Sequence, residues 1–240
     1  MKKLCLLLLL FLSHFLLMPL ETTHAKGKQE PVPDTVADSH SKYTAYFQTN
    51  SGRYCTAILI SSTAALTARH CVGREPAERS GTIYPGANEN KTPFGYMNIR
   101  TYTPHPNPKY DIAILKGTER DQDEFYKYYI RKFSTTVKGY TDEEFRTFMG
   151  QDAYAYGYPH GKQFRNNVQY RSDGKITSYK TKPIPYLLTD MPAFSGQSGS
   201  GVFKKDGKFL GIMVTRTKKN TANILPFTES IAKWINENAK

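Results

Sequence analysis

The chain has 240 residues, of which 39% are hydrophobic and 13% aromatic, so it can build a core and wholesale disorder is excluded. Its formal net charge of +12 favours anionic surroundings such as a cell envelope. The basic residues are dispersed and no nucleic-acid-binding motif appears, so we expect a solvated basic surface and no specific nucleic-acid partner.

The N-terminus has the pattern of a secretion signal over residues 1–25. Lys2 and Lys3 precede an apolar run, and small residues around Ala25 suit a signal peptidase. The run is short for a spanning helix and lacks a basic stop-transfer flank, so we expect cleavage and no transmembrane anchor. The mature protein would then begin at Lys26 and be secreted, or be periplasmic in a source with an outer membrane.

Two cysteines, Cys55 and Cys71, remain once the signal has removed Cys5. Two cysteines in an exported protein most often pair, and the bridge would stabilise the fold by roughly 3 kcal/mol in the chain-entropy description. The alternative is a pair of separate buried thiols.

The rest of the chain reads as short strands. Residues 26–42 are polar, contain two prolines and have no apolar period, which indicates a propeptide or a loose mature N-terminus. Residues 118–150 are charged and aromatic and are expected to connect two halves, with helical turns near 121–132 and 141–149. Apolar alternation predicts strands at 43–48, 55–60, 64–68, 96–102, 111–115, 153–158, 168–171, 175–179, 186–190, 202–205 and 208–214.

The last segment, residues 229–239, has apolar side chains at helical spacing and predicts one amphipathic helix. Many short strands and one terminal helix indicate an all-β architecture of the sandwich or barrel type.

A Gly/Ser-rich stretch at residues 194–201 is the first candidate for chemistry. Glycines on both sides of Ser198 suit a tight turn that presents one hydroxyl and leaves backbone N–H groups free for an oxyanion. The same composition also fits a plain flexible loop. A serine nucleophile needs a base and an orienting acid elsewhere in the chain.

His70 and Asp111 are the candidates for these two roles. His70 lies beside Cys71, where a disulfide would tether its backbone, whereas His105 and His160 are expected to be loop residues. Asp111 precedes a buried strand, and a carboxylate there needs a partner. That partner could be a histidine N–H or the backbone N–H groups at the start of the strand.

Four blocks, in this order, resemble the signature blocks of chymotrypsin-like serine proteases: Cys55–Ile60, Leu66–Cys71, Tyr110–Leu115 and Gly196–Ser200. Three further features resemble the bacterial branch that contains the glutamyl endopeptidases and the staphylococcal exfoliative toxins. These are Gly157–Pro159, Tyr170–Thr177 and the C-terminal helix. The resemblance covers approximately residues 43–240.

The resemblance implies two six-stranded antiparallel β-barrels and a C-terminal α-helix, with the active site in the cleft between the barrels. On this basis the first barrel spans 43–117, the connection 118–150, the second barrel 151–226 and the helix 227–240. It also implies that Ser198 is the nucleophile, His70 the general base and Asp111 the group that orients it. Backbone N–H groups of Gly196 and Ser198 would form the oxyanion hole.

Substrate-binding positions depart from the pattern of glutamyl endopeptidases. Ala193 and Met213 occupy places where a carboxylate-binding Thr or Ser and a His are expected. Arg216 follows on the same strand end, where it is either a bidentate partner for an acidic side chain or, as we favour, a solvated surface residue. Gln197 stands where digestive members have an acid that pairs with a new N-terminus, so activation by that ion pair is not expected.

We therefore expect a secreted, monomeric serine endopeptidase that acts on protein or peptide substrates through an acyl-enzyme, with acidic residues as the leading target. No cofactor is expected, and the histidines and cysteines lack metal-site spacing. The alternative is a secreted binding protein that keeps the protease fold, has little turnover and contacts envelope or host proteins.

Overall fold

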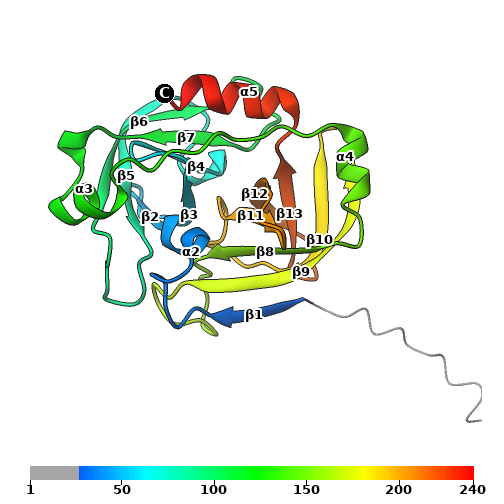
Figure 1. Cartoon of the computed structure of the whole chain (residues 1–240), viewed down its shortest axis with the longest axis horizontal. Coiled ribbons are helices and arrows are strands. Elements are labelled where there is room, and N and C mark those ends of the chain that lie inside the picture. The colour runs from blue at the N-terminus through cyan, green and yellow to red at the C-terminus, as the bar shows by residue number, and fades with distance from the viewer. Residues whose placement is uncertain (1–26) are drawn as a thin grey trace, which may run out of the picture.

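The computed structural model of the chain describes residues 27–240, so the expected signal peptide lies outside the described residues. These residues form two closed antiparallel β-barrels, joined by a helical connection and completed by a C-terminal helix (Figure 1). The fold class expected from the sequence is confirmed.

The first barrel closes in the strand order β2-β3-β4-β7-β6-β5. Its inward side chains form a core that includes Phe47, Leu66 and Ile114, all of which are fully buried. The strands are β2 (Thr44–Thr49), β3 (Tyr54–Leu59), β4 (Ala64–Thr67), β5 (Ala77–Pro85), β6 (Met97–Pro104) and β7 (Ala113–Lys116).

Sequence alternation misses β5, the one strand of this barrel that it does not predict. Arg79 has φ 50°, and the register of β5 against β6 shifts between Glu78 and Gly81. Such an irregularity interrupts the in–out pattern on which the sequence prediction depends.

The second barrel closes in the order β8-β9-β10-β13-β12-β11, and β11 pairs back to β8. Two separately predicted strands merge into the long β9, and β13 was not predicted. The strands are β8 (Asp152–Gly157), β9 (Tyr170–Lys180), β10 (Tyr186–Pro192), β11 (Gly201–Lys204), β12 (Phe209–Arg216) and β13 (Thr221–Pro226).

Residues 27–43 contain regular secondary structure, in the segment for which the sequence indicates a propeptide or a loose N-terminus. Its residues form strand β1 (Lys28–Pro31), which pairs with β9, and the short helix α2 (Ser39–Tyr43), which Asp38 caps. A four-residue polar strand carries no apolar period of its own, and it is stabilised by a neighbouring strand edge far along the chain.

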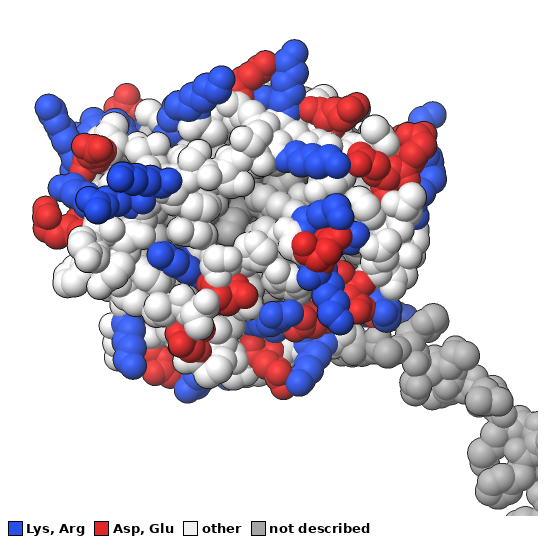
Figure 2. Space-filling model, viewed as in Figure 1, with Lys and Arg blue, Asp and Glu red and all other residues white. Residues whose placement is uncertain are grey.

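The connection contains a 3₁₀ turn, η2 (Glu119–Asp121), and two short helices, α3 (Glu124–Ile130) and α4 (Asp142–Thr147), near the turns expected from the sequence. The C-terminal helix α5 (Glu229–Asn238) packs Ile231 and Ile235 into the larger core. None of the helices within residues 27–240 combines the length and apolar character needed to cross a bilayer. On the face in Figure 2, basic and acidic side chains are interspersed.

Candidate active site

His70 lies in a one-turn 3₁₀ helix, η1 (Arg69–Cys71), directly after β4. The disulfide between Cys55 and Cys71, with Cα atoms 6.2 Å apart, ties this turn to strand β3. The buried Tyr102 hydroxyl contacts the carbonyl oxygens of Arg69 and Gly73 at 2.8 and 2.6 Å, on either side of the histidine. The backbone that carries the imidazole is therefore fixed from two directions.

Asp111, just before β7, holds His70 through both carboxylate oxygens. Oδ1 accepts the backbone N–H of His70 at 2.9 Å, and Oδ2 lies 2.6 Å from ring Nδ1. The histidine partner considered from the sequence is present, and the backbone N–H that Asp111 accepts is that of His70 itself rather than one at the start of β7. A proton on Nδ1 facing the carboxylate leaves Nε2 as the basic nitrogen of the ring.

The hydroxyl of Ser198 lies 2.9 Å from His70 Nε2, so the three side chains form one continuous hydrogen-bonded line. Ser198 belongs to a tight turn between β10 and β11, in which Gly196 and Gly199 have φ of 90° and 94°. A Cβ atom at Gly196 would lie 2.3 Å from the Tyr158 carbonyl oxygen. Only glycine fits there, which explains the Gly/Ser composition of the stretch.

The other two serines of this stretch are placed differently. Ser200 is fully buried, so a substrate cannot reach its hydroxyl. Ser195 is exposed, and its carbonyl accepts the backbone N–H of His160 at 2.6 Å. Ser198 is the serine of the stretch that contacts a histidine ring.

Thr56, in β3 of the first barrel, forms hydrogen bonds that hold the Ser198 turn in place. The sequence does not indicate this role. The Thr56 hydroxyl donates to the Gly196 carbonyl at 2.9 Å, and its N–H donates to the Ser198 carbonyl at 2.9 Å. The same hydroxyl accepts the N–H of Tyr158 at 3.0 Å. Thr56 is fully buried and lies 140 residues before Gly196 in the chain, so no local pattern identifies it.

Thr56 holds the carbonyls of Gly196 and Ser198, while the N–H groups of the same two residues stay open. Within residues 27–240, the N–H groups of Gly196 and Ser198 donate to no protein acceptor. Two open N–H groups beside a serine hydroxyl remain available to an acceptor on a substrate, which an oxyanion hole requires.

A pocket of about 320 Å³ opens beside Ser198 and contains all three residues considered for substrate binding. Ala193 and Met213 are buried apolar walls, at 1% and 2% exposure. Arg216 is exposed at the rim, where Nη1 donates to Asn220 Oδ1. Further lining comes from His70, Asp111, Phe194, Ser195, Val214 and Thr215.

His105 and His160 lie apart from this hydrogen-bonded line. His105 Nδ1 accepts the N–H of Asn107 at 3.0 Å, and its ring packs against Trp234 at a centroid distance of 4.6 Å. Burial lowers the pKa of His105. His160 serves the turn through its backbone N–H, as described for Ser195.

Comparison with known proteins gives a consistent family and fold. A sequence profile described as the trypsin-like peptidase domain matches residues 55–212. No curated protein matches the sequence. Among solved structures, a Glu endopeptidase in complex with MPD superposes with a TM-score of 0.69 at 21% identity, covering 87% of this chain and 95% of its own.

The protease Anisep from Arthrobacter nicotinovorans gives a TM-score of 0.65 at 16% identity, covering 88% of this chain and 99% of its own. A thermostable serine protease, AL20, from an extremophilic microorganism gives 0.64 at 15% identity, with coverage of 82% and 97%. At these identities the structural matches establish the fold.

Proposed function

Because the chain belongs to the trypsin-like peptidases and is a serine endopeptidase, we propose that it cleaves peptide bonds with Ser198, His70 and Asp111 as a catalytic triad. The observation that carries this proposal is the line of contacts from Asp111 Oδ2 through both His70 nitrogens to Ser198 Oγ, at 2.6 and 2.9 Å. The distances between neighbouring atoms in this line are those over which a proton can be transferred.

In the acylation step, Ser198 Oγ attacks the carbonyl carbon of the substrate while its proton moves to His70 Nε2. The negative charge that develops on the carbonyl oxygen is stabilised by the N–H groups of Gly196 and Ser198. The C–N bond then breaks, and the imidazolium gives its proton to the leaving amine. Asp111 stabilises the charged ring without taking its proton.

Deacylation repeats these steps with water. His70 takes a proton from the water molecule, the hydroxide attacks the acyl carbon, and the C–O bond to Ser198 breaks as the proton returns to the serine. All of these groups belong to the chain itself, and the half-exposed His70 side chain gives water access from the cleft.

We further propose that cleavage favours acidic residues, with Arg216 as the group that recognises the carboxylate. Of the five N–H donors of a guanidinium, one contacts Asn220, so other donors remain for a carboxylate. The apolar walls at Ala193 and Met213 would contact the aliphatic part of a glutamate side chain.

Secretion is part of the same proposal. The pattern of residues 1–25 supports export, and a disulfide such as Cys55–Cys71 persists in oxidising compartments.

Labelling with a fluorophosphonate probe tests the triad. Wild-type protein and a Ser195→Ala control should be modified, whereas Ser198→Ala should not. Absence of labelling in the disulfide-intact wild type would support the alternative of a protease-fold binding protein with little turnover.

A further inference from the structure

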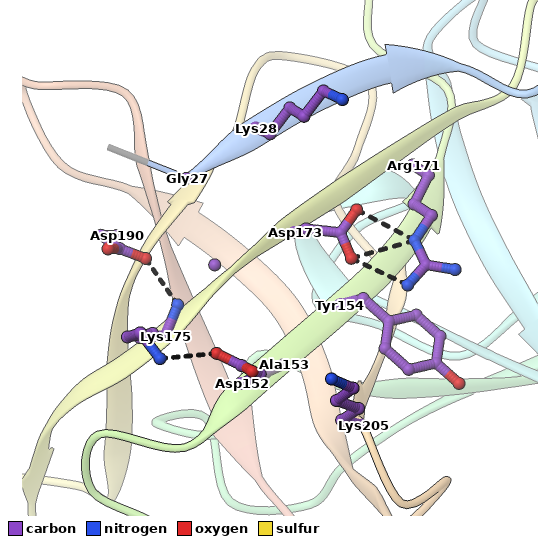
Figure 3. A pocket seen from close by; sticks show the side chains of 11 residues that line it. Gly27, Lys28, Asp152, Ala153, Tyr154, Arg171, Asp173, Lys175, Asp190 and Lys205 are labelled. Carbon is purple, nitrogen blue, oxygen red and sulfur yellow. Dashed lines mark hydrogen bonds and ion pairs between the residues drawn. The ribbon is translucent and has the colours of Figure 1, made fainter. Parts of the chain in front are cut away.

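Strand β1 lies along the first half of β9, opposite β8. Lys28 pairs with Asp173 and Pro31 with Tyr170, while β10 pairs only with the second half of β9. The strand is fixed beyond both ends: Gly27 N–H donates to the Asp190 carbonyl at 3.2 Å and Val32 N–H to the Gln169 carbonyl at 2.8 Å. Figure 3 shows Gly27 and Lys28 beside Asp173 and Asp190, at the edge of a charged hollow.

The alternation of side chains along β1 sends Gln29 inward. Lys28 and Glu30 are exposed and pair with each other at 2.7 Å on the outer face. Gln29 Nε2 donates to the hydroxyl of Ser172 at 2.7 Å and to Oε1 of Gln197 at 3.1 Å. Both acceptors belong to fully buried residues. This contact joins the first described strand to a residue 168 positions later.

Gln197 precedes Ser198 and closes the turn that carries it. Its Oε1 also accepts the N–H of Phe194 at 2.9 Å, and its Nε2 donates to Ser172 at 3.2 Å. Its backbone carbonyl accepts the N–H of Ser200 at 3.0 Å. The Gln197 side chain therefore fixes the turn from within, and Gln29 of β1 and Ser172 of β9 hold that side chain in place.

We propose that Gln29 is a positioning residue for the oxyanion hole, which it orders through Gln197. The inference rests on the proposed role of the Gly196 and Ser198 N–H groups. Both partners are neutral side-chain amides, and Gln29 lies within the chain. The contact therefore needs neither an ion pair nor a free α-amino group.

The physical reason is the number of contacts that hold a buried side chain in place. Without the Gln29 amide, Gln197 Oε1 keeps only the Phe194 N–H and Ser172 Oγ only the Gln197 amide, so the Gln197 side chain is held by fewer hydrogen bonds and is free to shift. A misplacement of about 1 Å in a catalytic group can cost roughly a hundredfold in rate. We therefore expect loss of Gln29 to reduce kcat more than it affects substrate binding.

The test compares Gln29→Met, which keeps the side-chain length and removes the donor, with Lys28→Met, which changes the exposed neighbour on the same strand. Gln29→Met should lower kcat by about ten- to a hundredfold and leave KM within about threefold. Its affinity for a peptidyl boronate, which binds as a tetrahedral adduct, should fall by a similar factor. Affinity for the product peptide, measured as product inhibition, should not change. Lys28→Met should match wild type in all four measurements.

A second variant, Gln29→Glu, remains informative if Gln29→Met does not fold. The ionised carboxylate of this variant cannot donate to Gln197, but its protonated carboxyl form can. The ratio of variant to wild-type kcat should therefore rise as the pH falls from about 8 to about 5. A purely structural role would change thermal unfolding without this pH dependence.

Two results would overturn the proposal and leave the proposed function intact. One is a folded Gln29→Met or Gln29→Glu variant that keeps wild-type kcat and boronate affinity while Ser198→Ala is inactive. The other concerns a protein that begins at Lys26 and is active. If adding two residues ahead of Lys26 abolishes its activity, then the α-amino group at the chain end, rather than Gln29, orders the site. Failure of the wild type to turn over substrate or take the fluorophosphonate would overturn both proposals.

Discussion

The proposed catalytic centre is held by short hydrogen bonds, whereas the pocket beside it consists of apolar walls and one exposed charge. At the centre, Asp111 uses both carboxylate oxygens and His70 both ring nitrogens, all at 2.6–2.9 Å. In the pocket, Ala193 and Met213 offer apolar walls, and the nearby charge, Arg216, is exposed. Short contacts hold the groups of the centre, whereas the proposed recognition of acidic residues depends on one exposed cation, Arg216. Substitutions should therefore have large effects at the centre and graded effects in the pocket.

The largest effect is expected from removal of the base or the nucleophile. His70→Ala and Ser198→Ala should each lower kcat by about 10⁴- to 10⁶-fold. The His70 side chain is 49% exposed, so the midpoint of urea unfolding should change little. Steady-state kinetics and urea titration measure both quantities, with His105→Ala and His160→Ala as controls. A comparable loss of kcat in either control would contradict the assignment of the base.

Asp111→Asn is expected to be nearly as damaging. The amide can still accept the His70 backbone N–H, but its NH₂ group facing Nδ1 favours the tautomer that carries the proton on Nε2. Such a ring cannot accept the Ser198 proton, so kcat should fall by about 10⁴-fold with little change in KM. Retention of more than about a tenth of the activity would argue that Asp111 is a structural residue.

Thr56→Val tests the contacts by which Thr56 of the first barrel holds the turn that carries Ser198. The substitution keeps the shape and removes the hydroxyl contacts with Gly196 and Tyr158, so kcat should fall by about a hundredfold. The free energy of unfolding should fall by roughly 1–3 kcal/mol because buried partners lose a hydrogen bond. Thr56→Ser should restore most of both quantities in the same assays.

Arg216→Ala addresses the pocket and should have a smaller effect. Cleavage after glutamate should fall about tenfold relative to cleavage after glutamine, because an exposed ion pair contributes modestly. Paired peptides that differ only in this residue measure the ratio, and Lys218→Ala is a matched control on the same exposed segment. An unchanged ratio in Arg216→Ala would remove this arginine from the proposed recognition of acidic residues.

The smallest expected effect concerns His40. This residue should influence how stability depends on pH without influencing catalysis. Burial lowers the pKa of His40, whose ring stacks on Phe203 at a centroid distance of 3.8 Å. As the pH falls, the His40 ring is therefore protonated in the unfolded chain before it is protonated in the folded chain. The free energy of unfolding falls as the pH drops below the ordinary histidine pKa of 6.5 towards the lower pKa of the folded state. The loss should stay below about 1 kcal/mol because solvent screens a half-buried ring.

Urea unfolding at about pH 8 and about pH 5.5 should show a smaller pH effect in His40→Gln than in wild type. The kcat at neutral pH should be the same in both proteins, because His40 contacts Tyr154 and Phe203 rather than the catalytic groups. A pH effect of equal size in both proteins would assign the stability change to other residues.

Local patterns predict most of the strands, and the resemblance of four short blocks to chymotrypsin-like proteases implies the two barrels and the proposed triad. His70 is flanked by Cys71 in one block, and Ser198 lies between two glycines in another. Gln29 and Thr56 give no such signal, since each acts on a turn at least 140 residues away. Gln29 also lies in a polar segment without apolar periodicity, where its strand depends on the edge of β9.

The position of Thr56 has a consequence for how the site assembles. Thr56 is adjacent to Cys55, and His70 is adjacent to Cys71. Because the Cys55–Cys71 disulfide joins these two positions, the proposed base and the threonine that holds the turn belong to one covalently closed unit of the first barrel. Any displacement of this unit from the second barrel separates His70 from Ser198 and, at the same time, releases the carbonyls of Gly196 and Ser198. If the proposed roles hold, we expect proton transfer and oxyanion binding to be lost together when the two barrels move apart.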